Sequence, residues 1–149
     1  MSEKKQESTA PSFNLQKIYL KDCSYEAPNT PGVFAQQVQP QFSIDVDIQH
    51  APISVEEGLY DVVLSVTVKG ETGNGAVFLI EVHQAGIFQI VGLSGGELEQ
   101  VLEINCPSIL LPYARQTVSS LVTSGGFPQL LVNPVNFEAL YEQRHAERK

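Results

Sequence analysis

A glycine-rich turn at residues 70–75 separates two segments in which apolar and polar side chains alternate. Residues 60–69 before the turn and residues 76–83 after it carry an apolar side chain at every second position. This period of two is typical of strands with one buried face. Glycine and asparagine in the turn tolerate the backbone conformations that a tight reversal requires. The sequence therefore predicts an antiparallel hairpin, and residues 42–48 repeat the alternation as a further strand.

The strand at residues 76–83 has an outward face that is less polar than a solvated face should be. Its inward residues are predicted to be Ala76, Phe78, Ile80 and Val82, and its outward residues Val77, Leu79, Glu81 and His83. An apolar side chain that faces water beside a carboxylate is a mismatch, because a solvated strand face is normally polar. We therefore expect a functional reason for Leu79.

The N-terminal part of the chain predicts one more strand. Residues 15–25 have the composition of a strand, although their two faces alternate poorly. Pro28 and Pro31 follow, and because proline lacks a backbone donor they should interrupt the ladder. Residues 27–31 are therefore expected to form an extended crossover to the next strand.

From Leu93 onward the apolar period becomes helical, and three helices are predicted. Ser94 and Glu97 fit a capping box that starts the first helix, which Cys106-Pro107 should end. The second helix is expected at about residues 108–124. Asn133-Pro134 should open the third, with asparagine as the cap and proline at the first helical position.

Four strands followed by helices predict an α+β fold, with helices packed on one face of a four-stranded antiparallel sheet. A chain of 149 residues is long enough for one domain with its own core. We expect a flexible polar arm at residues 1–12, a single domain at residues 13–144 and a short tail at residues 145–149.

The composition excludes several classes of protein. The formal net charge is −8, and an acidic surface repels nucleic acid. No apolar stretch has the length of a signal peptide or a membrane span, so the cytoplasm is the expected location. Cys23 and Cys106 lie too far apart in the sequence to suggest a disulfide framework or a cysteine zinc site.

Motifs for catalysis are missing from the sequence. His50, His83 and His145 lie on separate elements without metal-ligand spacing, and the glycines at 70–75 lie between strands rather than before a helix. Asp45 and Asp47 fit a solvated strand face. The missing motifs make an enzyme the less expected class, although catalytic groups can converge in three dimensions without a sequence motif. An enzyme whose titratable groups converge around His83 or Asp45, and a protein that binds a small apolar ligand, remain alternatives.

Several segments resemble one known family along nearly the whole chain. They are residues 18–28 (IYLKDCSYEAP), 84–88 (QAGIF), 106–107 (CP) with 111–115 (LPYAR), and 126–130 (GFPQL) with 133–137 (NPVNF). In this order, on a plan of strands followed by helices, they closely resemble SecB, the export chaperone of Gram-negative bacteria.

The resemblance implies a homotetramer, built as a dimer of dimers, that binds unfolded preproteins and delivers them to the SecA ATPase. It implies no catalytic residue, cofactor or metal. It places docking of SecA on four residues of the outer sheet face, Asp22, Glu26, Leu79 and Glu81. Leu79 and Glu81 are two residues apart and Asp22 and Glu26 are four apart, so each pair shares a strand face.

The resemblance also suggests where clients bind and where subunits meet. Candidates for the unfolded-polypeptide groove are Val33, Phe34, Phe42, Phe88, Phe127, Phe137, Leu140 and Tyr141. Candidates for the oligomer interface are Ile80, Val82, Gln84, Val118 and Leu121. Two features differ from many members of the family, namely Val38 near the position of a crossover tryptophan and the short C-terminus of mixed charge. A SecB-like paralogue with another client, such as an antitoxin, remains an alternative.

Overall fold

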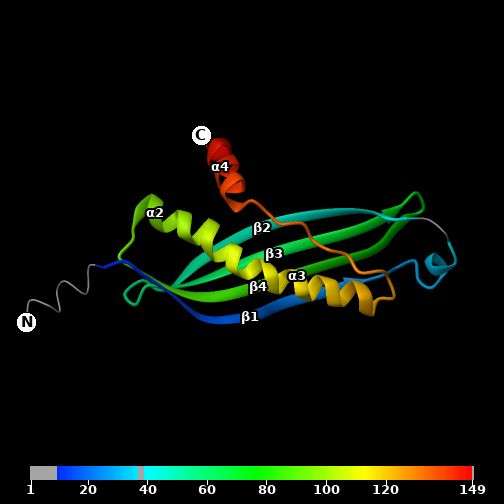
Figure 1. Cartoon of the computed structure of the whole chain (residues 1–149), viewed down its shortest axis with the longest axis horizontal. Helices are drawn as coiled ribbons and strands as arrows, with labels where there is room; N and C mark the ends of the chain where they lie inside the picture. The colour runs from blue at the N-terminus through cyan, green and yellow to red at the C-terminus, as the bar shows by residue number, and fades with distance from the viewer. Residues whose placement is uncertain (1–9, 37–38, 149) are drawn as a thin grey trace, which may run out of the picture.

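The computed structural model describes residues 10–36 and 39–148 and contains one antiparallel sheet with helices on one side (Figure 1). The strands lie in the order β1-β4-β3-β2, so β3 and β4 form the centre and β1 and β2 the edges. Their bounds are Ser12–Glu26 for β1, Gln41–Ser54 for β2, Leu59–Thr72 for β3 and Gly75–Val91 for β4. The predicted fold class and the predicted hairpin are confirmed, with Gly73 and Asn74 between β3 and β4.

The helical part follows the last strand, as the sequence predicts. It consists of α2 (Gly95–Gln100), the π-helical turn η2 (Val101–Asn105), α3 (Cys106–Ser124) and α4 (Phe137–Arg148). A short 3-10 helix, η1 (Gly32–Ala35), lies in the crossover between β1 and β2. Within the described parts of the chain, no helix is both long and apolar enough to cross a membrane.

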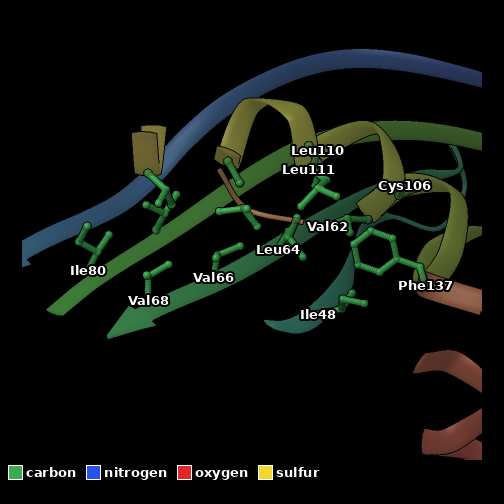
Figure 2. Close-up of a cluster of buried hydrophobic side chains, with 14 of the residues drawn as sticks. Ile48, Val62, Leu64, Val66, Val68, Ile80, Cys106, Leu110, Leu111 and Phe137 are labelled. Atoms are coloured by element: carbon green, nitrogen blue, oxygen red, sulfur yellow. The ribbon is translucent and has the colours of Figure 1, made fainter. Parts of the chain in front are cut away.

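The core lies between α3 and the two central strands, where Figure 2 shows the side chains of Val62, Leu64 and Val66 meeting Leu110 and Leu111. Each aliphatic side chain removed from water in this way contributes roughly 1.5–3 kcal/mol. Gly86 of β4 permits the close approach of α3, because a Cβ at this position would lie 3.0 Å from Leu110 Cδ2. The even-numbered residues of β4 therefore face α3. Its odd-numbered residues project from the opposite side of the sheet, which we call the open face.

The predicted break at Cys106-Pro107 is wrong, because the chain remains helical from Gly95 to Ser124. In η2 the Cys106 N–H donates to the carbonyl of Val101, five residues earlier, instead of four. This wider π-helical turn ends at Asn105, two residues before Pro107. The helix continues past the proline, although proline has no backbone N–H to donate. The predicted capping box is also missing, since Ser94 makes no side-chain capping bond.

The last helix begins later than predicted. Residues 133–136 are not helical, and α4 begins at Phe137. Asn136 takes the capping position, where its side-chain oxygen accepts a hydrogen bond of 3.0 Å from the Ala139 N–H. The helix continues to Arg148, through most of the segment predicted as a tail.

Val77 is buried although its strand position predicts an outward side chain. The crossover is not simply extended, because it turns at residues 28–31 and forms η1, which lies against the start of β4. The Asn29 side chain holds the crossover there by donating a 2.7 Å hydrogen bond to the carbonyl of Ala76. Val77 is also the extra residue of a β-bulge, because Gly70 pairs with Phe78 and Glu71 with Ala76. The bulge and the crossover together bury a position that simple alternation assigns to solvent. Val38, which was predicted to replace a family tryptophan, lies outside the described residues.

Candidate functional site

The open face carries the four residues to which the resemblance assigns docking. In the β1–β4 register, Glu26 lies opposite Leu79, and Asp22 lies opposite His83, two residues beyond Glu81. Directly paired residues of antiparallel strands project to the same face of a sheet. Asp22, Glu26, Leu79 and Glu81 therefore form one surface, which we call the acidic patch.

The carboxylates of the acidic patch are accessible to a partner. Asp22 and Glu26 are exposed, the side chain of Glu81 is 48% exposed, and Leu79 is half-buried between them. The neighbouring lysines pair with other carboxylates. Lys21 lies 3.8 Å from Asp61, and Lys69 lies 3.7 Å from Glu71. The patch therefore combines negative charge with an apolar side chain that is only partly covered.

A tyrosine bridge that the sequence did not indicate lies beside the acidic patch. The Tyr19 hydroxyl, on β1, donates a 2.6 Å hydrogen bond to Asp61 on β3 and so spans β4. This hydrogen bond, with partial burial and the nearby negative charge, raises the pKa of Tyr19 to about 12. Ala85 and Val63 occupy the same row of the sheet as Tyr19, which explains why both are buried on the open face.

An aromatic cavity of about 400 Å³ lies where the crossover meets the segment after α3. Four of the predicted groove residues line it, namely Val33, Phe34, Phe42 and Phe127. Phe34 and Phe42 are 51% and 44% exposed. The Phe127 ring packs between two others, with ring centroids 5.3 Å from Phe34 and 5.2 Å from Phe78. The rest of the lining is uncharged and consists of Gln36, Gln39, Pro40, Val77, Gly126, Pro128 and Gln129.

A second groove of about 450 Å³ lies between the edge strand β2 and the segment that leads into α4. Its lining is largely aliphatic and consists of Ile44, Val46, Val132, Val135 and Leu140, with Asp45 and Asn133. Leu140 is the predicted groove residue that it contains. The two grooves therefore divide the predicted set between two sites.

The remaining predicted groove residues belong to the core. Phe88 is fully buried and Phe137 is 3% exposed, so neither has surface available for a client. Tyr141 is also buried, and its hydroxyl donates to Glu99 over 3.1 Å. Sequence alone could not separate these aromatic residues from Phe34 and Phe42, because the residue types are similar and burial depends on the distant segments that pack over each ring.

The predicted oligomer interface needs the same correction. Ile80, Val82 and Val118 are fully buried between the sheet and α3, and the buried Gln84 side chain donates to the backbone carbonyl of Tyr19 over 3.0 Å. Their side chains pack within their own chain and cannot contact another copy. Leu121 is half-buried and keeps some accessible surface.

An apolar row on the edge strand β1 is a more suitable surface for a second copy. Phe13, Leu15 and Leu20 are 40%, 43% and 45% exposed and lie opposite even-numbered residues of β4, on the side of α3. Tyr113 of α3 is exposed on the same side of the sheet. Register shifts between Leu15 and Lys17 and between Leu20 and Asp22 explain why this face was not recognisable from simple alternation.

The histidines and cysteines do not form a metal site. Each histidine pairs with a different carboxylate, namely His50 with Glu103 (3.3 Å), His83 with Glu81 (3.5 Å) and His145 with Glu99 (2.7 Å). Within residues 10–36 and 39–148, no group of three or more His, Cys, Asp or Glu side chains is arranged to hold a metal ion. Cys23 is exposed, whereas burial raises the pKa of the Cys106 thiol to about 12.

The alternative of an enzyme centred on His83 can be tested against the structure. The side chains near His83 include Ser65 and Glu81, which are the residue types of a hydrolytic triad. The Ser65 hydroxyl and His83 Nδ1 are 2.7 Å apart. A triad also needs backbone donors that stabilise an oxyanion. Ser65 lies on a central strand that is paired on both sides, with Asp47 and with His83. The backbone N–H groups near Ser65 form the hydrogen bonds of the sheet, so they are not available to stabilise an oxyanion. The geometry therefore does not support acyl transfer.

Comparisons with known proteins agree on one family. A family model described as preprotein translocase subunit SecB matches residues 6–148. A protein-export protein SecB of Chromobacterium violaceum is 47% identical over 148 residues, which cover 99% of this chain and 96% of the relative. The protein-export protein SecB of Hydrogenovibrio crunogenus is 46% identical over 150 residues, which cover 99% and 97%.

A solved structure has the same fold. It is a SecB-like chaperone of Mycobacterium tuberculosis in complex with a peptide from an antitoxin, and it aligns with a TM-score of 0.68 at 14% identity. The alignment covers 83% of this chain and 90% of that one. Together with the matches along nearly the full sequence, the fold establishes that this chain belongs to the SecB family of protein-export chaperones and is not an enzyme.

Proposed function

We propose that this chaperone binds unfolded preproteins in the aromatic cavity and the second groove, and delivers them to SecA through the acidic patch. The observation that carries the proposal is the aromatic cavity itself. Phe34 and Phe42 are large apolar side chains that remain half exposed at a concave, uncharged surface. Such a surface is costly in water and gains free energy when an apolar side chain covers it.

The chemistry of the aromatic cavity suits clients of many sequences. Burial of apolar area contributes roughly 25 cal/mol per Å² and depends little on the identity of the side chain. Aromatic rings and glutamine amides can adapt to different apolar or polar groups without a fixed partner charge. The peptide bound by the mycobacterial SecB-like chaperone supports binding of polypeptides.

Two separate grooves in each chain favour long clients. A client that occupies the aromatic cavity reaches the second groove with a high effective concentration, so its total affinity exceeds that of either groove. A folded protein cannot expose an extended chain to both sites. The proposed arrangement therefore selects unfolded chains over folded ones.

The acidic patch suits a basic segment with an apolar anchor. Leu79 supplies an apolar contact that is flanked by Glu81 on β4 and Glu26 on β1. Opposite charges across an interface speed up association and select the partner. The acidic patch shares no residue with the aromatic cavity, so SecA and a client would contact different side chains.

The apolar row on β1 supports assembly in the proposed function. A long unpaired edge strand with apolar side chains invites pairing with another strand, and pairing with a second copy would satisfy it. We infer a homotetramer, built as a dimer of dimers, that works in the cytoplasm as the family does.

The client site is tested by Phe34→Ala and a matched control, Ile53→Ala. Ile53 is 53% exposed at the end of β2 and does not line either groove. We expect Phe34→Ala to weaken binding of a urea-unfolded preprotein about tenfold, because loss of a ring removes apolar contact area. Ile53→Ala should bind like the wild type. Equal affinities for all three proteins, measured by fluorescence titration, would exclude the aromatic cavity as the client site.

The docking site is tested by Glu81→Lys and by a matched control, Glu56→Lys, at an exposed position of the β2–β3 turn. We expect Glu81→Lys to abolish binding to SecA in size-exclusion chromatography with light scattering, while the preprotein stays bound. Glu56→Lys should bind both. A wild-type protein that holds preprotein but ignores SecA would instead indicate a paralogue with another client.

A further inference from the structure

His83 lies at one end of the acidic patch, in the row of Asp22 and next to the row of Glu81, and the docking proposal gives it no role. It follows Glu81 by two residues on β4 and lies opposite Asp22 of β1 and Ser65 of β3. Residues paired in this way share the open face. The imidazole is 33% exposed, so a docked partner would reach it.

One hydrogen bond and one close carboxylate surround the His83 ring, and both are compatible with a neutral and with a protonated ring. Nδ1 lies 2.7 Å from the Ser65 hydroxyl, and Nε2 lies 3.5 Å from Glu81 Oε2. In the neutral tautomer that carries its proton on Nε2, toward the Glu81 carboxylate, Nδ1 accepts a hydrogen bond from the Ser65 hydroxyl. A protonated ring donates from both nitrogens, and the serine hydroxyl rotates to accept. The site therefore takes up a proton without rearrangement of the strands.

We propose that His83 sets the charge of the acidic patch, and that its protonated form weakens docking of the basic segment of SecA. The inference rests on the proposed docking function and adds a residue that regulates it. An imidazolium beside Glu81 neutralises part of the charge that attracts a basic segment, and it repels the incoming cation directly.

Charged groups on the three other strands surround His83. On β1 the imidazole faces Asp22. On β3 the charges along the same face are Asp61 and Lys69, four residues before and after Ser65, and Lys69 pairs with Glu71. On β2, beyond Ser65, lies Asp47, which accepts a 3.0 Å hydrogen bond from Arg144. The cation Lys21 pairs with Asp61. Histidine is the side chain whose charge ordinarily changes between pH 5 and 8, and His83 is the histidine that lies on this face beside Glu81.

The size of the effect follows from the separation of the charges. Two unit charges about 4 Å apart in a largely aqueous environment interact by an amount that changes an equilibrium constant roughly fivefold. At this separation, physiological salt screens the interaction only in part. We expect the dissociation constant for the basic segment to rise about threefold to fivefold when His83 becomes protonated.

The test uses the full-length protein and a fluorescent peptide with the sequence of the basic docking segment of the cognate SecA. Its anisotropy is titrated at pH 8 and pH 6 at constant ionic strength. Wild type is compared with His83→Gln, which stays neutral, and His83→Lys, which stays charged. His145→Gln is the matched control, because His145 lies on α4 and pairs with Glu99. Titration of the peptide itself affects all four proteins equally.

The expected result is a threefold to fivefold weaker binding of wild type and His145→Gln at pH 6 than at pH 8. His83→Gln should bind tightly at both values, and His83→Lys weakly at both. A His83→Gln variant that keeps the full pH dependence would overturn the role of His83 and leave the docking site intact. A wild type that fails to bind the peptide at pH 8 would overturn the docking function as well.

Discussion

Single residues determine which side chains of the open face are covered. Ala85 is the small residue in the row that Tyr19 crosses, and it leaves space for the ring to reach Asp61. Lys21 also pairs with Asp61, so this carboxylate is held away from the acidic patch. Tyr19 thereby joins β1 to the central strands by a side-chain contact in addition to the ladder.

The Tyr19 bridge predicts a change of stability at alkaline pH. The folded pKa of about 12 lies above the unfolded value of 10, so the stabilisation is fully present below pH 10 and is lost as the pH rises through 12. Tyr19→Phe should be less stable than wild type by about 1 kcal/mol at pH 8. The difference should shrink in urea unfolding at pH 10 and at pH 11.5. Cys106 and Tyr25 titrate in both proteins, and a difference that stays constant with pH would contradict the prediction.

At the scale of elements, the π-helical turn η2 determines how α4 is held. Glu103 of η2 is buried and faces His50 of β2 and Arg144 of α4, at 3.3 Å and 3.9 Å. Arg144 also donates to Asp47 of β2. These contacts connect three elements beside the second groove. The position of Leu140 in that groove therefore depends on the polar contacts of α4 as well as on the burial of Phe137.

The contact between Glu103 and Arg144 predicts a coupling that can be measured. Arg144→Met should destabilise the protein by about 1–2 kcal/mol, because it leaves a buried carboxylate with one partner fewer. Glu103→Leu combined with Arg144→Met should recover much of this loss, since the uncompensated charge is then removed. Urea unfolding of the two single variants and the double variant gives the coupling energy. Strictly additive effects would show that the two side chains do not interact.

At the scale of the molecule, the three proposed activities use different surfaces. The clients would occupy the aromatic cavity and the second groove, and SecA would occupy the open face. The apolar row of β1 is left for assembly, on the side of the sheet where α3 packs. A chain of this size could not place three large apolar or charged surfaces on one face without mutual exclusion. The separation lets a loaded chaperone reach SecA.

The proposed assembly predicts that charges in the apolar row separate the subunits. Leu15→Asp with Leu20→Asp should lower the mass measured by light scattering from that of a tetramer, because buried carboxylates without partners are costly. Ile53→Asp with Val55→Asp is the matched control at the β2–β3 turn, where both side chains are exposed. The control should keep the wild-type mass. A tetramer in the row variant, with folding verified by circular dichroism, would place the interface elsewhere.

The sequence by itself determined the features that depend on local backbone geometry. Alternation over residues 60–69 and 76–83 predicts the hairpin, because successive side chains of a strand point to opposite faces wherever the strand lies. The same period brings Leu79 and Glu81 onto one face. The segments that resemble SecB identified the family, which the comparisons then established.

Tertiary structure alone decided which of these side chains are available. Val77 has the period of an exposed residue, but the crossover covers it. Phe34 and Phe88 are the same residue type, but one lines the aromatic cavity and the other is enclosed under α3. Pro107 predicts a helix end, but the π-helical turn accommodates it. Periodicity describes the direction of a side chain relative to its own backbone, whereas burial depends on which distant segment packs over it.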